Sequence, residues 1–133
     1  MSSRVVNAKR LWLCDDCDQW HLTKTVSCQA CGCKNLTYFQ SKKEAKRWAD
    51  LRMLEKAGEI SNLSRQIVFP LTCAMGTIET PTGRTMTHSV DFEYLDNRSG
   101  KLMLEDAKGF DTDMSHLKRQ LVQLMFGRTI TIY

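Results

Sequence analysis

Two closely spaced pairs of cysteines constrain the fold of this chain more than any other feature of its sequence. Cys14 and Cys17 form one Cys-x-x-Cys pair, and Cys28 and Cys31 form a second pair after ten intervening residues. Each pair can present two thiolates from one tight turn, and two such turns close a tetrahedron around Zn²⁺. Gly32 follows the second pair directly, where a glycine relieves backbone crowding. The spacing therefore predicts a small structural zinc ribbon, with these four cysteines as the ligands of one ion.

Two other side chains compete for the same site. His21 lies between the pairs and Cys33 follows the second pair. We rank His21 as a surface residue and Cys33 as a spare thiol, and an exchange of a cysteine for a histidine in the site stays open. A ribbon of this size cannot bury a core alone, so metal binding must supply its folding free energy. Cys73 stands apart from the pairs and is expected to be a small core residue.

The remaining composition is that of a soluble globular protein, with 42% apolar and 26% charged residues. No apolar run reaches transmembrane length, and the N-terminus lacks the apolar stretch of a signal peptide. We therefore expect a cytoplasmic protein that has no membrane partner. In that compartment, six cysteines favour metal binding over disulfides. We predict a basic arm and ribbon over residues 1–38 and a larger domain over residues 39–133.

Positive charge is concentrated in the N-terminal half of the chain. Residues 1–60 hold 11 Lys and Arg against 7 Asp and Glu, whereas residues 61–133 hold 8 against 8. Three aromatic residues near these cations, Trp12, Trp20 and Tyr38, offer stacking surfaces, and the combination favours a nucleic-acid partner. A solvated basic surface is the alternative. The candidate DNA-binding residues are Lys9, Arg10, Lys42, Lys43, Lys46 and Arg47.

A helix is predicted to follow the ribbon. Residues 41–44, Ser-Lys-Lys-Glu, form a capping box, and Gly58 ends the helix. Ala45, Trp48 and Leu51 recur at helical spacing and form a buried face. Glu44 has a complete structural explanation as the acidic member of the capping box.

The second half of the chain is predicted to alternate between strands and a helix. Residues 66–71 alternate in polarity and form a strand, and residues 74–86 form an irregular or hairpin excursion. A second helix runs from Asp113 to Phe126, between a cap at Thr112 or Asp111 and Gly127, and the chain ends in a strand over residues 129–133. The predicted buried stripe of this helix is Met114, Leu117, Leu121, Leu124 and Met125.

A β-hairpin is predicted around the polar turn of residues 96–100. If the turn is centred between residues 98 and 99, the numbers of paired residues sum to 197, and Asp91 faces Asp106. Lys108 then projects on the same face as Asp106. Facing carboxylates repel each other unless a cation lies between them, and Mg²⁺ prefers such oxygen ligands. A hairpin with exposed acids and a neutralising lysine is the alternative interpretation.

Asp91, followed fifteen positions later by Asp106-Ala107-Lys108, resembles the PD-(D/E)XK nuclease signature, although Val90 stands where the signature has proline. From Phe39 to Tyr133, the order of elements is similar to that of small phage-encoded members of this superfamily. The resemblance implies an α/β fold, with a restriction-endonuclease-like αβββαβ core around a mixed sheet and the ribbon as a small N-terminal addition.

The same resemblance implies a Mg²⁺- or Mn²⁺-dependent DNA endonuclease that acts in phage recombination or genome processing. Its substrate would be branched DNA such as a Holliday junction or a flap, and its active form a homodimer. Asp91, Asp106 and the Ala107 carbonyl would bind the metal, Lys108 would orient the attacking water, and Glu44 would complete the cluster. A non-catalytic nucleic-acid-binding or partner-adaptor protein on a nuclease-like core remains the alternative.

Overall fold

The computed structural model of the protein describes residues 11–22, 26–107 and 112–133. Three predicted functional residues, Lys9, Arg10 and Lys108, lie outside the described residues. The chain divides into two compact units, Met1–Met53 and Leu54–Tyr133. We predicted a division after residue 38, whereas the compact units divide near the end of a helix. None of the helices within the described residues is long and apolar enough to cross a membrane.

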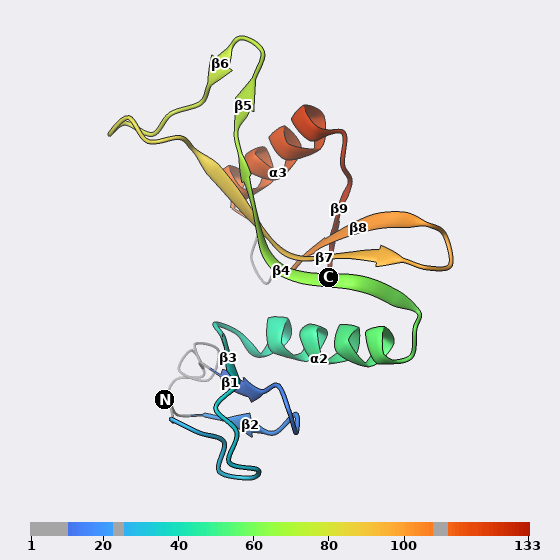
Figure 1. Ribbon diagram of the computed structural model, residues 1–133. Coiled ribbons are helices and arrows are strands. Elements are labelled where there is room, and N and C mark those ends of the chain that lie inside the picture. Colours follow the sequence, from blue (N-terminus) through green and yellow to red (C-terminus); the bar gives the residue numbers. More distant parts are fainter. Residues whose placement is uncertain (1–10, 23–25, 108–111) are drawn as a thin grey trace. The chain divides into compact units, whose positions relative to one another are not determined.

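The first unit contains a small antiparallel sheet with the strand order β2-β1-β3 (Figure 1). Its elements are β1 (Leu11–Cys14), β2 (Trp20–His21), β3 (Leu36–Phe39) and most of the helix α2 (Lys42–Lys56). The backbone N–H of Glu44 donates to Ser41 Oγ at 3.2 Å, as the capping box predicts. At the other end, Gly58 has a φ of 81° and the N–H of Glu59 donates to the carbonyl of Leu54, which is a Schellman ending.

The start of α2 packs on the strands of the small sheet. Leu11, Leu13, Phe39 and Ala45 form one buried cluster, and Trp48 packs against it. The ribbon strands therefore share a hydrophobic core with the helix, in line with the prediction that a ribbon of this size cannot bury a core alone. The physical reason is that each element supplies one apolar face, and neither face can be buried alone.

The second unit is built on a four-stranded mixed sheet with the order β4-β7-β8-β9 (Figure 1). The strands β4, β7 and β8 are antiparallel neighbours, and β9 lies parallel to β8. A short hairpin, β5–β6, follows β4 and precedes β7 in the chain, and it projects away from this sheet. The elements are β4 (Ile60–Pro70), β5 (Thr72–Cys73), β6 (Gly76–Thr77), β7 (Thr87–Asp96), β8 (Lys101–Asp106), α3 (Asp113–Phe126) and β9 (Ile130–Ile132). The predicted mixed sheet and the predicted order of its main elements are confirmed.

The core of the second unit lies between this sheet and α3. Side chains from four strands and the helix meet there, and the rings of Phe69 and Phe126 lie 5.1 Å apart. Both ends of α3 are as predicted: Thr112 Oγ1 accepts a hydrogen bond from the N–H of Ser115, and Gly127 has a φ of 63°. The buried members of the core are Phe69, Leu71, Val90, Leu104, Val122 and Ile130.

Two sequence predictions about this core are wrong. Met114, Leu117 and Leu124 were predicted to be buried, but they are 54%, 49% and 82% exposed. The face of α3 that meets the core is centred on Val122, one position from the predicted stripe, because the sheet covers only one side of the helix. Cys73 was predicted to be a core residue, but it is exposed in the short strand β5.

The core position Leu104 provides a test of this packing. Leu104→Ala should lower the free energy of unfolding by about 2–5 kcal/mol, because it leaves a cavity among fully buried neighbours. The matched control, Leu102→Ala on the same strand, removes a half-exposed side chain and should cost only about 0.5 kcal/mol. Urea denaturation followed by circular dichroism measures both changes, and equal losses would contradict the packing described here.

Candidate metal centres

The four predicted zinc ligands converge in the first unit. The ligand atoms of Cys14, Cys17, Cys28 and Cys31 all lie within 4.8 Å of one another. The Sγ atoms of Cys14 and Cys31 are 3.6 Å apart, and so are those of Cys17 and Cys28. A tetrahedral zinc ion with Zn–S bonds of about 2.3 Å places its sulfurs about 3.8 Å apart. The cysteine cluster therefore has the donor set and the spacing of a structural zinc site.

The backbone shapes both cysteine turns. Within them, the N–H of Cys17 donates to Cys14 Sγ at 3.5 Å, and the N–H of Ala30 donates to Cys28 Sγ at 3.3 Å. Gly32 donates to the carbonyl of Cys28 at 2.8 Å and has a φ of 81°, a conformation that disfavours side chains. The N–H groups of Cys17 and Ala30 point at sulfur and stabilise the thiolate form that binds a metal.

The two competing side chains both lie at the edge of the cysteine cluster. Cys33 Sγ is 2.9 Å from Cys14 Sγ, and His21 Nε2 is 3.3 Å from Cys28 Sγ. Both residues therefore lie closer to the ligands than a spare thiol and a surface histidine would. The pairing of Trp12 with His21 between β1 and β2 explains this position of the imidazole, and the hydrogen bond from the N–H of Cys28 to the carbonyl of Cys33 holds Cys33 beside the second pair.

The thiols of the cluster ionise unequally in the absence of an ion. Burial opposes ionisation of Cys28, but hydrogen bonds from the backbone of Cys31 and Ala30 and from His21 outweigh it and lower the pKa of Cys28 to about 5. A backbone hydrogen bond from Cys33 lowers the pKa of Cys31, but burial and the thiols nearby raise it to about 11. Binding of a divalent cation must therefore displace protons from the cluster, and its affinity must fall as the pH falls.

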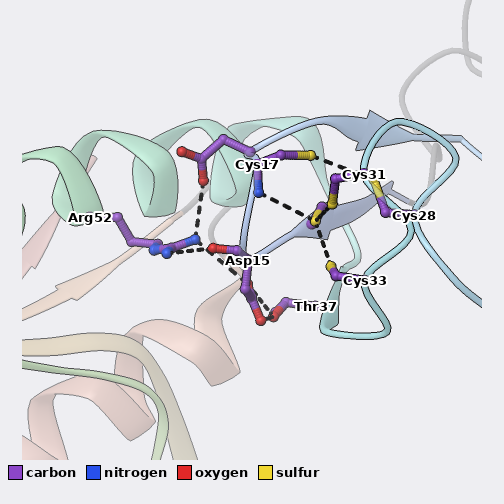
Figure 2. A network of polar contacts seen from close by, with 9 residues as sticks. Asp15, Cys17, Cys28, Cys31, Cys33, Thr37 and Arg52 are labelled. Carbon is purple, nitrogen blue, oxygen red and sulfur yellow. Dashed lines mark hydrogen bonds and ion pairs between the residues drawn. The ribbon is translucent and has the colours of Figure 1, made fainter.

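The helix α2 is tied to the first cysteine turn by Arg52 (Figure 2). The Nη2 atom of Arg52 donates to the carbonyl of Asp15 at 2.8 Å, and its Nη1 lies 3.2 Å from Asp18 Oδ1. The carboxylate of Asp15 also accepts a hydrogen bond from Thr37 Oγ1 on β3. One guanidinium thus links the helix to the metal-binding turn, so order in the ribbon and order in the helix are coupled.

A pair of carboxylates lies in the second unit, where β7 and β8 meet. The paired residues of this hairpin, from Phe92 with Glu105 to Asp96 with Lys101, have numbers that sum to 197, and one further step of the same register would bring Asp106 opposite Asp91. The predicted register is therefore confirmed. The Oδ2 atom of Asp91 accepts a hydrogen bond of 2.7 Å from the N–H of Ala107, which ties the first acid to the backbone of the acid-x-Lys segment.

The strand β7 is irregular at Asp91. Val90 and Leu104 belong to one core, yet Leu104 pairs with Glu93, three residues from Val90. In a regular strand, residues three apart point to opposite faces, so β7 changes face between Val90 and Glu93. A second irregularity lies beside it in the neighbouring strand, β4.

Gln66 has a φ of 53° and lies between two regular pairs, one on each side of Asp91. A glutamine in this left-handed region is uncommon, and such irregularities re-aim side chains at functional sites.

His88 is the residue whose role the sequence underestimates. Its place in the sequence favours a polar residue at a strand end, but it is only 7% exposed, and its Nε2 lies 3.6 Å from Oδ2 of Asp106, which is 2% exposed. Within the described residues, Nε2 has no hydrogen-bond partner. The alternation of β7 contains the missed signal, since His88 falls in the same inward series as Val90.

Comparison with known proteins identifies the family of the chain. A family model described as a protein of unknown function, DUF1064, matches residues 31–131. The chain belongs to the DUF1064 family. No curated protein and no solved structure matches the chain. The DUF1064 match includes both carboxylates of the hairpin but begins at Cys31, so Cys14, Cys17 and Cys28 precede it.

The other predicted site residues of this DUF1064 protein lie in the first turns of α2. Glu44 is buried, Lys42, Lys43 and Lys46 are exposed, and Arg47 is half-buried. Glu44 lies in the first unit and the hairpin acids lie in the second, so its role as a metal ligand stays a prediction. Among the described residues, the four cysteines form the one group of three or more potential ligands that meets within 4.8 Å.

Metal analysis tests the cysteine cluster. The parent protein should carry one zinc ion per chain, and a variant with both Cys28→Ser and Cys31→Ser should lose it, because two of four thiolates are gone. The loss should also reduce the helicity of α2, since Arg52 joins the helix to the first turn. Elemental analysis of purified protein and circular dichroism measure the two effects.

The matched control is Cys73→Ser, which removes an exposed thiol outside the cluster and should leave one zinc bound. Cys33→Ser should also retain the ion. Retention of zinc by the double variant would instead show that Cys33 and His21 replace the missing ligands.

Proposed function

We propose that this DUF1064 protein is a metal-dependent DNA endonuclease of the PD-(D/E)XK type, with one structural zinc ion in its cysteine cluster. The observation that carries the proposal is the register of the β7–β8 hairpin, which pairs Phe92 with Glu105 and, continued by one step, would bring Asp91 opposite Asp106. The order α2, β4, β7, β8, α3, β9 around a mixed sheet supports it, because this is the order that the resemblance implies.

The donor set at the hairpin fits a hard divalent cation. Two carboxylates and a backbone carbonyl supply the oxygen ligands that Mg²⁺ requires. The nearby imidazole of His88 is a better ligand for Mn²⁺ than for Mg²⁺. His88 Nε2, buried beside Asp106, is the kind of polar atom that a metal site satisfies. A bound cation would supply charge stabilisation to the phosphate and lower the pKa of a water molecule.

The chain's own residues have distinct tasks in this proposal. Asp91 and Asp106 hold the cation, and the hydrogen bond from Ala107 to Asp91 fixes the first carboxylate relative to the second. His88 holds the carboxylate of Asp106 in position from within the core. Lys108 orients the attacking water, and on the resemblance alone Glu44 would be the third acidic residue of the proposed site. Glu105 has another task, because the hydroxyl of Tyr94 donates a hydrogen bond to it.

The proposed substrate is branched DNA, either a Holliday junction or a flap. A four-way junction needs two cuts on opposed strands, and one chain supplies one site, so its resolution requires a homodimer. A flap needs a single cut and can be processed by one chain.

A second candidate is a zinc-ribbon protein that binds nucleic acid or a partner protein without catalysis. The observation in its favour is that, in the described residues, only the cysteines converge tightly enough to form a group of three or more metal ligands. Metal-dependent cleavage of labelled DNA separates the two candidates, since a binding module leaves the substrate intact.

Substitutions at the hairpin test the enzyme directly. Asp91→Asn, Asp106→Asn and Lys108→Ala should each reduce cleavage with Mg²⁺ or Mn²⁺ by at least about a hundredfold, because metal binding or water activation is lost. The measurement is the single-turnover rate on labelled flap and junction substrates, with circular dichroism as the test of folding.

Two acidic positions serve as controls for that experiment. Asp113→Asn changes an exposed acid at the start of α3 and should leave the rate unchanged. Glu105→Gln should retain cleavage if it folds, because Glu105 pairs with Phe92 rather than with Asp91. Full activity of Asp106→Asn together with loss in Glu105→Gln would contradict the assignment.

Sedimentation velocity tests the assembly. If junctions are resolved by paired cuts, the active species should sediment as a homodimer, and dilution below its dissociation constant should reduce junction cleavage more than flap cleavage. An active monomer that makes both cuts in one encounter would exclude symmetric resolution.

A further inference from the structure

We propose that a groove in the first unit, between Trp20 and the start of α2, binds one unpaired nucleotide of a single-stranded nucleic acid. The groove encloses about 410 Å³, within the range of about 300–1,000 Å³ that is usual for small-ligand sites. Its apolar floor is formed by Leu11, Ala45 and Ala49. The proposal rests on the proposed function only for the class of ligand, a nucleic acid.

Trp20 supplies the aromatic wall. It lies on the edge strand β2 and pairs with Leu13, so its side chain projects toward the face that α2 covers. The ring of Phe39 supports it from one side, with centroids 6.3 Å apart and planes at 65°. Trp20 nevertheless stays 40% exposed. A partly exposed indole held from one side is a surface on which a nucleobase can stack.

The helix supplies both the space and the charge. Ala45 and Ala49 are four residues apart on α2, and their small side chains leave room above the helix surface. Lys42 and Lys46 have the same spacing and also line the groove, and both are exposed. Asp50 lines it as well and offsets one of these charges. The lysines lie where the phosphates beside a stacked base would be.

Charge favours a polyanion over a neutral ligand. Residues 1–53 contain 10 Lys and Arg against 5 Asp and Glu, whereas residues 54–133 contain 9 against 10. Bases in a duplex are stacked on both faces and cannot enter such a groove, so the ligand is single-stranded. Among the proposed substrates, a flap with a single-stranded tail fits the groove better than a fully paired junction.

Binding measurements test the groove apart from catalysis. We would titrate a fluorescent oligodeoxythymidylate of about 12 nucleotides with Asp91→Asn protein, without added Mg²⁺, and follow anisotropy at several salt concentrations. Trp20→Ala should weaken binding about 5- to 150-fold, and Trp20→Phe should restore most of it. Replacing Lys42 and Lys46 with Gln should reduce the slope of log K against log salt by about 1.4.

Lys43→Gln is the matched control, since Lys43 is exposed on the same helix turn but does not line the groove. Parent-like binding by Trp20→Ala would overturn the proposal. The proposal would also be overturned if Lys43→Gln weakened binding as much as replacement of Lys42 or Lys46 alone. Equal displacement of the oligonucleotide by polyglutamate from parent and Trp20→Ala protein would show that the site recognises negative charge without stacking, and it would overturn the proposal too. If Trp20→Ala loses zinc or helicity, Trp20→Phe and the lysine variants decide the question. Because the binding protein lacks Asp91, failure of the nuclease assignment leaves this outcome unaffected.

Discussion

The register of the β7–β8 hairpin is the constraint on which the second unit depends. Asp96 fixes it at the turn: its carboxylate accepts hydrogen bonds from the N–H of Arg98 and the hydroxyl of Ser99, which lower its pKa, and its carbonyl accepts one from Gly100. Gly100 has a φ of 74°, which the turn requires. A slip of one residue would turn Leu104 out of the core and bring Glu105 opposite Asp91. The turn therefore determines at once which side chains form the core and which carboxylates meet.

The first unit depends on a different kind of constraint, because its sheet is too small to be stable alone. A hydrophobic core shared with α2 and a four-thiol cluster stabilise it together, and Arg52 connects them through Asp15 and Asp18. Without a bound metal, thiol groups of unequal pKa would lie 3.6 Å apart or less. Arg52 would then hold a cysteine turn that no metal ion closes. Metal binding at the cysteine cluster would therefore be cooperative with helix packing, within one unit rather than between an appendage and a domain.

Local signals in the sequence were sufficient where the chemistry itself is local. The caps of α3 at Thr112 and Gly127, the turn around Asp96 and the cysteine spacing each involve only near neighbours, and each was predicted correctly. The buried face of α3 was predicted only in part: Leu121 and Met125 pack on the core as expected. Leu117 and Val122 are equally apolar, and only the sheet decides which of them is covered. The change of face at Asp91 was missed for a similar reason: it depends on Gln66, which belongs to another strand. His88 was within reach, since simple alternation along β7 places it inward.

Under the proposed function, two metal chemistries would be separated along this chain, and the separation follows from the ligands themselves. Thiolates take Zn²⁺ with high affinity and exclude water, which suits a site that must hold a fold together. Carboxylates take Mg²⁺ or Mn²⁺ weakly and leave positions for water and phosphate, which suits turnover. The charge follows the same division, with the excess of Lys and Arg in the unit of the cysteines and a slight excess of acids in the unit of Asp91 and Asp106. A basic unit attracts a polyanion without needing to react with it, and an acidic unit can approach phosphate only with a cation between them. In the proposed enzyme, therefore, cleavage would require the divalent ion at the hairpin, whereas substrate capture would not.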